Sequence, residues 1–197
     1  MNFCIIDYKL GNIKSIQSLL SALRINSYLS SDSKVIEKAD VVLLPGVGTF
    51  GSAINFLKNK KLDKIIIKRF KGKKPIIGIC LGMQLFFESS CENGNHKGLA
   101  LIKGKLKKNK NSHIGWNNLS FYKNNDLLDE ITNDDQFYFV HSYFFDIKNK
   151  NNIICDTKYG INIPAVVNKD NIFGFQFHPE KSGRSGLKIL YNWLKVS

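Results

Sequence analysis

A cysteine framed by two glycines is the feature of this sequence best suited to chemistry. Cys80 follows the short apolar run Pro75 to Ile79, and Gly78 and Gly82 lie two residues to either side of it. A strand that turns sharply into a helix lifts one side chain out of the turn, as in a nucleophile elbow. Glycines fit such a turn because a Cβ would clash where strand and helix crowd together. The helix N-terminus would also favour the thiolate. The pattern favours a nucleophile over the alternative, a buried cysteine on a core strand.

His178 is the candidate base for that nucleophile. A cysteine hydrolase needs a base to deprotonate the thiol and a third group to orient the base. His178 follows the apolar run Ile172 to Phe177, and Glu180 comes two residues later, after Pro179. Residues two apart on an extended segment project to the same side, so we expect Glu180 to brace the imidazole. The alternative is a surface His-Pro turn with a solvated glutamate.

A glycine-rich turn is the candidate oxyanion hole. The apolar run Val41 to Leu44 ends in Pro45-Gly46-Val47-Gly48. Backbone without side chains can direct N–H groups at a tetrahedral intermediate, together with the amide of Leu81 after the nucleophile. A phosphate-binding loop is the rival interpretation, but the lysine and hydroxyl of a P-loop do not follow.

The elements that must position these residues alternate between strand and helix in the first half of the chain. Apolar runs predict strands at 3–7, 26–29, 39–44 and 75–79, and helical spacing predicts helices at 12–23, 52–57, 63–70 and after Cys80. The second half is rich in strands, at 137–140, 153–157, 163–167 and 172–177, and ends in a helix at 185–194. We therefore expect a single α/β domain over residues 1–197. Its central sheet is mostly parallel and flanked by helices, with an antiparallel β extension.

Size and composition narrow the function classes. A chain of 197 residues suits one domain, and it has no apolar run long enough to span a bilayer. The four scattered cysteines suggest neither disulfides nor a zinc site. The net charge of +13 is spread over lysine- and asparagine-rich stretches without interleaved aromatics, which argues against nucleic-acid binding. We expect a cytoplasmic protein with no cofactor, no metal, no nucleic acid and no membrane partner.

Taken together and in this order, the motifs resemble those of the class I (triad) glutamine amidotransferases. The resemblance covers essentially the whole chain and is nearest to the glutaminase subunits of imidazole glycerol phosphate synthase, from histidine biosynthesis. The stretches that carry it are Asp7-Tyr8 with Gly11-Asn12, Pro45 to Gly51, Gly78 to Leu85, Gly115-Trp116-Asn117, Tyr138 to Tyr143 and Gly174 to Gly183. It implies a flavodoxin-like α/β fold.

The resemblance also implies roles for individual residues. Cys80 would attack the side-chain amide of L-glutamine, His178 would protonate the departing ammonia and Glu180 would orient His178. The oxyanion hole would involve Gly48 and Leu81, and the amino-acid end of glutamine would be held by Gln84, Ser142 and Tyr143.

The family's partner is a (β/α)₈ cyclase subunit, which receives the ammonia within a heterodimer. Asn12, Trp116, Tyr138 and Lys181 fall where the family meets this partner. Glutaminase activity in the family is weak until a ligand binds the partner, which suggests that the turn Gly46 to Gly48 rearranges.

Two departures from the family pattern leave an alternative open. Ser112 and Ile114 replace a proline and a methionine in the segment before Trp116, and Lys9-Leu10 replaces small residues near the start. Both changes touch the partner-facing side. A paralogous glutaminase that supplies ammonia for amidination of a bacterial surface sugar is therefore an alternative, as are another thiol hydrolase of the same fold and a non-catalytic binding module.

Overall fold

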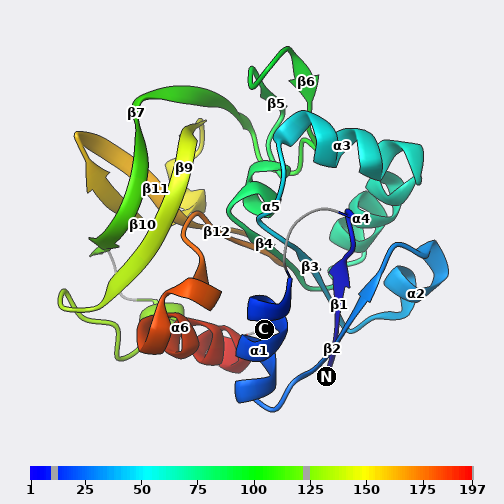
Figure 1. Ribbon diagram of the computed structural model, residues 1–197, viewed down its shortest axis with the longest axis horizontal. Helices are drawn as coiled ribbons and strands as arrows, with labels where there is room; N and C mark the ends of the chain where they lie inside the picture. The colour runs from blue at the N-terminus through cyan, green and yellow to red at the C-terminus, as the bar shows by residue number, and fades with distance from the viewer. Residues whose placement is uncertain (10–12, 122–124, 197) are drawn as a thin grey trace.

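The fold is built on an eight-stranded sheet that is parallel in one half and antiparallel in the other (Figure 1). The computed structural model describes residues 1–9, 13–121 and 125–196. Within them the strand order is β2-β1-β3-β4-β12-β11-β10-β8. The strands are β1 (Asn2–Ile6), β2 (Asn26–Ser30), β3 (Val41–Leu44), β4 (Ile76–Ile79), β8 (Ser120–Phe121), β10 (Ile153–Tyr159), β11 (Ile161–Lys169) and β12 (Ile172–Phe175).

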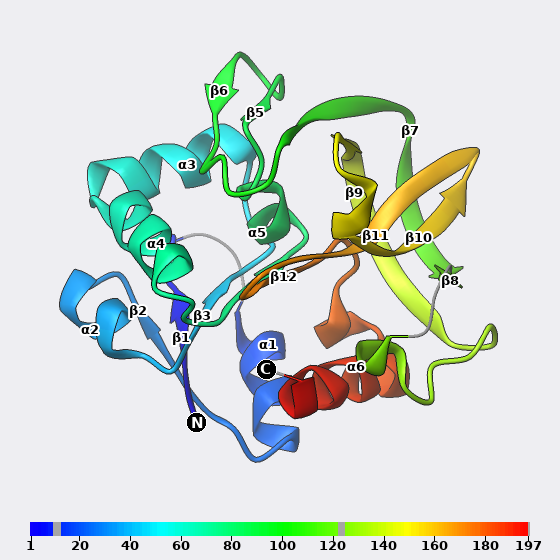
Figure 2. The same ribbon diagram turned by 180° about the vertical axis from the view of Figure 1, so that it is seen from behind.

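Helices cover both faces of the parallel half of this sheet, and Figure 2 shows the same two layers from behind. The helices are α1 (Lys14–Ala22), α2 (Ser33–Lys38), α3 (Phe50–Asn59), α4 (Leu62–Lys71), α5 (Leu81–Gln84) and α6 (Gly183–Val196). Apolar residues of α1 and α6 pack with one side of the strands, and those of α2 to α5 pack with the other. Because β1, β3, β4 and β12 are buried on both faces, they are continuous apolar runs.

A second sheet, in the order β6-β5-β7-β9, arches over the carboxyl ends of the parallel strands (Figure 1). Its strands are β5 (Ser89–Ser90), β6 (His96–Lys97), β7 (Gly104–Asn118) and β9 (Gln136–Ile147). The antiparallel ribbon β7–β9 is interrupted by a bulge between Lys108 and His113. The expected α/β architecture with a mostly parallel sheet and an antiparallel extension is confirmed.

Some element boundaries differ from the sequence prediction. The sequence predicts no strand between 101 and 136, whereas β7 runs through the lysine- and asparagine-rich stretch 104–111. The strand expected at 137–140 continues to Ile147. Helix α2 was not predicted; Asp32 caps it by accepting hydrogen bonds from the N–H groups of Lys34 and Val35. The expected helix start at Asn12 lies outside the described residues.

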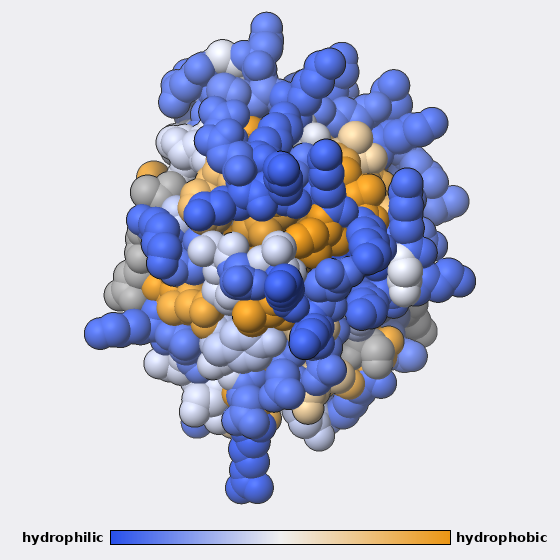
Figure 3. Space-filling view, turned by 90° about the vertical axis from the view of Figure 1, so that its right-hand side faces the viewer, coloured by the Kyte–Doolittle hydropathy of each residue, from blue (hydrophilic) through white to orange (hydrophobic). Residues whose placement is uncertain are grey.

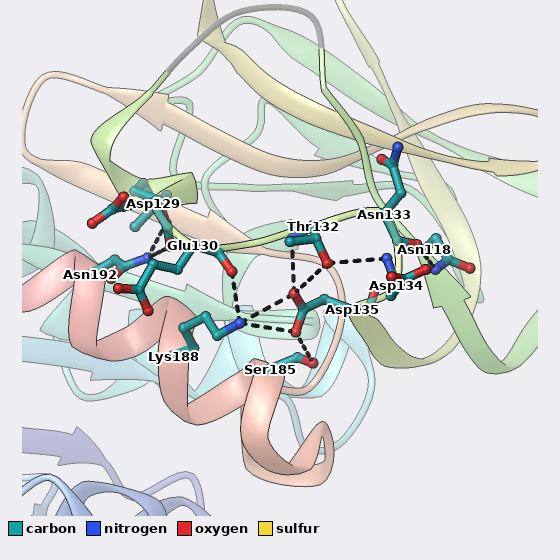
Figure 4. Close-up of polar contacts among 11 residues, drawn as sticks. Asn118, Asp129, Glu130, Thr132, Asn133, Asp134, Asp135, Ser185, Lys188 and Asn192 are labelled. Carbon is teal, nitrogen blue, oxygen red and sulfur yellow. Dashed lines mark hydrogen bonds and ion pairs between the residues drawn. The ribbon is translucent and has the colours of Figure 1, made fainter.

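A polar clasp ties the segment before β9 to helix α6 (Figure 4). The carboxylate of Asp135 accepts hydrogen bonds from Thr132 and from the hydroxyl of Ser185, at 2.7 Å, and it pairs with Lys188 at 3.3 Å. Lys188 also donates to the carbonyl of Glu130. The clasp fixes where β9 begins, and β9 carries several of the candidate site residues.

On the side of α2 to α4, hydrophilic side chains project around a band of apolar ones (Figure 3). No helix in the described residues is long and apolar enough to cross a membrane.

Candidate active site

Cys80 occupies the turn between β4 and α5 with a backbone conformation that few residues adopt. Its φ is 46° and its ψ is −106°, and its N–H donates to the carbonyl of Phe175 at 2.7 Å. A Cβ on Gly82 would lie 1.9 Å from the carbonyl oxygen of Leu44, and one on Gly78 would lie 2.5 Å from the backbone nitrogen of Met83. The two glycines are therefore required by the close approach of helix to strand, which is the reason the sequence suggested.

His178 and Glu180 form a buried pair beside the cysteine. Nδ1 of His178 lies 2.7 Å from Oε1 of Glu180, and both side chains are about 5 % exposed or less. Burial alone would lower the pKa of His178, but hydrogen bonds to Cys80 and Glu180 and the charges of both groups outweigh it and raise the pKa to about 10. The ring is therefore an imidazolium at neutral pH, and it holds a proton that it can give up beside Cys80.

The local geometry of this pair differs from the one we expected. Glu180 lies within a 3₁₀ turn, Pro179–Lys181, rather than on an extended segment that continues past His178. The proline begins the turn, and the turn brings the carboxylate back to the imidazole. The contact was predicted, but its backbone cause was not.

The glycine-rich turn after β3 packs directly against the cysteine and the histidine. A Cβ on Gly46 would lie 2.9 Å from Cβ of Cys80 and 3.0 Å from Cε1 of His178. Gly48 has a φ of 89° and lines the same cavity as Leu81. Leu81 is the first residue of α5, where amides have no partner within the helix. Both proposed oxyanion-hole residues thus line the cavity that contains Cys80.

A cavity of about 360 Å³ opens over this cluster. Gln84, Ser142 and Tyr143, which the resemblance assigned to glutamine, all line it, as do the glycine turn, Cys80 and His178. Its walls come from β9, from α5 and from the turns after β3 and β12. The structure therefore brings together side chains that are far apart in the sequence, at the carboxyl edge of the parallel strands.

Two residues with contacts in the site were not singled out from the sequence. Gln176 is fully buried, and its Nε2 lies 3.6 Å from Sγ of Cys80. Glu92 lines the cavity, and its carboxylate accepts the N–H of Phe50 at 2.7 Å. Gln176 lies two residues before His178 in the same motif, so its position in the sequence could have identified it as a site residue. Glu92 stands in a loop without any local pattern.

Three of the four residues assigned to the partner face form a surface cluster at the β7–β9 ribbon: Trp116 lies on β7, Tyr138 on β9, and Lys181 in the 3₁₀ turn after β12. The rings of Trp116 and Tyr138 are 5.8 Å apart, and Nζ of Lys181 lies 5.8 Å from the centre of the Tyr138 ring. Trp116 is 54 % exposed. Lys181 also lines the cavity, so the cluster adjoins the site. Asn12, the fourth residue of this set, lies outside the described residues.

Comparison with known proteins agrees with this geometry. Residues 4–196 match the family model described as glutamine amidotransferase class-I. In fold, the chain is similar to the PurLQS structure from Thermotoga maritima, with a TM-score of 0.79 and 19 % identity over 99 % of this chain and 98 % of that chain. The chain belongs to the class I glutamine amidotransferases, since that family model matches nearly its whole length.

Relatives of higher identity narrow the assignment. The chain is 47 % identical over 194 residues to the imidazole glycerol phosphate synthase subunit HisH of Caldanaerobacter subterraneus, covering 96 % of this chain and 95 % of the relative. It is 43 % identical to the HisH subunit of Methanocaldococcus jannaschii, covering 98 % of each. Within its class it belongs to the HisH family, the glutaminase subunits of imidazole glycerol phosphate synthase.

Proposed function

We propose that Cys80, His178 and Glu180 are the catalytic triad with which this glutaminase subunit hydrolyses L-glutamine and releases ammonia to a synthase partner. The observation that carries the proposal is the buried His178–Glu180 pair beside a cysteine held in an elbow, at 2.7 Å between Nδ1 and Oε1. The further proposal that residues 1–197 work as a single domain is supported by the family match over residues 4–196.

The reaction follows from the protonation states of the pair. The thiolate of Cys80 attacks the side-chain carbonyl carbon of glutamine, and the N–H groups near Gly48 and Leu81 bind the oxygen as it gains charge. The C–N bond breaks, and the imidazolium of His178 gives its proton to the departing ammonia. His178, now neutral, takes a proton from water, which attacks the thioester. Glutamate leaves and the thiolate is restored.

Glutamine would lie with its amide at Cys80 and its amino-acid end at Gln84, Ser142 and Tyr143. The carboxylate of Glu92 lines the same cavity and carries the charge that attracts an ammonium group. We assign the α-ammonium of glutamine to Glu92.

The chain is a subunit of a synthase complex, and we propose that its partner is a (β/α)₈ cyclase bound as a heterodimer. The docking face we propose is the surface cluster of Trp116, Tyr138 and Lys181, because it combines aromatic rings and a cation next to the cavity. Exposed tryptophan and tyrosine at such a place are typical of protein interfaces. Ammonia released at Cys80 would leave on this side. We further propose a cytoplasmic location, which four free cysteines support.

The test is glutamate release by the chain mixed with a cognate cyclase and its nucleotide ligand. We expect release to rise when the partner and its ligand are both present. The Cys80→Ala variant should release no glutamate above background while it retains its fold and its affinity for the partner. A chain that no cyclase stimulates, or a Cys80→Ala variant that still turns over, would contradict the proposal.

A further inference from the structure

Two buried histidines beside the cavity have no part in the mechanism above. His113 on β7 and His141 on β9 are cross-strand neighbours, 2 % and 6 % exposed. Nδ1 of His113 lies 3.2 Å from Nε2 of His141. His141 lines the cavity that holds Cys80 and His178. Because both rings are buried, their nitrogen atoms need hydrogen-bond partners within the protein.

The first end of their hydrogen-bond chain is fixed by Asn117. Its Oδ1 accepts the N–H of Asn118 at 2.8 Å, and its Nδ2 donates to the carbonyl of Lys158 at 3.0 Å. These two bonds settle which atom of the amide is the nitrogen. Nδ2 also lies 3.2 Å from Nε2 of His113. Since Nδ2 is a donor only, Nε2 of His113 accepts and the ring carries its proton on Nδ1.

The other end of the hydrogen-bond chain independently indicates the same tautomer, with the proton on Nδ1. Nδ1 of His141 lies 2.8 Å from the backbone carbonyl of Tyr143, which can only accept. His141 therefore carries its proton on Nδ1, and its Nε2 accepts from Nδ1 of His113. The hydrogen bonds run in one direction, from Asn117 through His113 and His141 to Tyr143. All four ring nitrogens are used, and both rings are neutral.

A proton added to either ring would break this order, because an N–H would then face a second N–H or the amide of Asn117. Burial, in agreement, lowers the pKa of both histidines to about 4. His113 is also held between the rings of Phe139 and Tyr159, with centroids 4.5 and 4.2 Å away. With every ring nitrogen already in a hydrogen bond and the charged form disfavoured by burial, the pair is suited to holding position rather than to accepting a proton.

The acceptor at the end of the chain belongs to the glutamine-binding segment. The carbonyl of Tyr143 also accepts Nε2 of Gln84, at 3.5 Å. We propose that the chain Asn117–His113–His141 is a positioning device that holds the Tyr143 carbonyl, and with it Gln84, in the arrangement that binds glutamine. The inference rests on the proposed function. Its starting point, Asn117, follows Trp116 on β7, so the device links the partner-facing strand to the substrate subsite.

Two substitutions of His113 separate the effect of its hydrogen bond to His141 from the effect of filling space between Phe139 and Tyr159. His113→Phe keeps an aromatic ring between Phe139 and Tyr159 but leaves Nε2 of His141 without a donor. His113→Asn places an amide N–H near the former Nδ1 and restores that donor. In the complex with the cyclase, we expect His113→Phe to raise KM for glutamine about tenfold, with a smaller change in kcat, and His113→Asn to recover most of the loss.

Controls distinguish this effect from a general loss of structure. His96→Asn alters a histidine that takes no part in the hydrogen-bond chain, so this variant should leave the KM for glutamine unchanged. Thermal unfolding and the rate at which iodoacetamide alkylates Cys80 should be similar in all variants. A KM for His113→Phe within twofold of the unchanged chain, or no recovery in His113→Asn, would overturn the inference.

A spectroscopic measurement tests the same hydrogen-bond chain without relying on catalysis. Nitrogen-15 NMR of the histidine rings at pH 7 should show His113 and His141 as neutral rings protonated on Nδ1, and His178 as an imidazolium. A proton on Nε2 of either paired ring overturns the inference even if glutamate is released normally. Failure of the proposed function would instead appear as no glutamate release by the unchanged complex.

Discussion

The backbone at Cys80 carries a strained conformation that fixes the direction of its thiol. A φ of 46° with a ψ of −106° is unfavourable for any residue with a Cβ, at a cost on the order of 1–3 kcal/mol. The surrounding contacts enforce it, since the adjoining strand and helix have no room to relax. The strained turn is a functional feature, because the side chain it exposes is the proposed nucleophile.

Replacing Cys80 with glycine should therefore give a more stable protein than replacing it with alanine, and both variants should release no glutamate. Cys80→Ala keeps the Cβ and its strain, whereas Cys80→Gly removes both. We expect the free energy of unfolding of Cys80→Gly to exceed that of Cys80→Ala by about 1 kcal/mol, measured by urea denaturation. A glycine variant clearly less stable than the alanine variant would show that the turn is not strained.

The raised pKa of His178 predicts a particular pH dependence of stability. The folded protein holds this proton more tightly than the unfolded chain, since the pKa rises from 6.5 to about 10. The stabilisation is complete below about pH 6.5 and is lost as the pH rises through about 10. We expect the difference in unfolding free energy between the unchanged chain and His178→Asn to shrink from pH 6 to pH 10. A difference that is constant over this range would contradict the assignment.

At the scale of elements, the clasp on α6 holds β9, the strand that brings His141, Ser142 and Tyr143 to the site. The Asp135 carboxylate is largely buried and satisfies three groups, on Thr132, Ser185 and Lys188. Removing it leaves the N–H of Thr132 and the hydroxyl of Ser185 without this acceptor, while Lys188 keeps only the carbonyl of Glu130. The strand and the helix that follows the proposed triad would then separate more readily.

Asp135→Ala should thus lower the free energy of unfolding by about 2 kcal/mol. The neighbouring Asp134 provides a matched control, because it is exposed and its side chain takes no part in the clasp (Figure 4). We expect Asp134→Ala to change stability by less than about 0.5 kcal/mol. Urea denaturation of the two variants side by side gives the comparison. Equal losses of stability would show that the clasp does not stabilise the start of β9.

The same elements show what the sequence could and could not predict. The parallel strands and the elbow were predictable because they are local apolar runs bounded by glycine and proline. Strand β7 was not, because its few buried residues, such as Leu106 and His113, stand among exposed lysines and asparagines. Helix α2 has only Ile36 buried, so it shows no periodicity. The role of Glu92 depends on Phe50, 42 residues away, and no local pattern encodes that distance.

At the scale of the whole molecule, the net charge of +13 and the aromatic cluster act on different steps of association. Hydrophilic side chains project from much of the face in Figure 3, and lysine and arginine outnumber aspartate and glutamate by 29 to 16. Dispersed charge of this kind affects the rate of encounter more than the lifetime of a complex. The lifetime depends on a few buried aromatic anchors. Trp116 is the residue of the described surface cluster best placed to be one.

Trp116→Ala should therefore weaken binding of the cyclase subunit at least tenfold, mainly through faster dissociation, while leaving the fold intact. Tyr191→Ala is a matched control, because Tyr191 is 52 % exposed against 54 % for Trp116 but lies on α6 rather than on the β7–β9 ribbon. Surface plasmon resonance with the immobilised cyclase measures both. If the two variants bind equally well, the ribbon is not the docking face. If only Trp116→Ala dissociates faster, the partner docks beside the cavity, because Lys181 belongs both to this cluster and to the wall of the cavity.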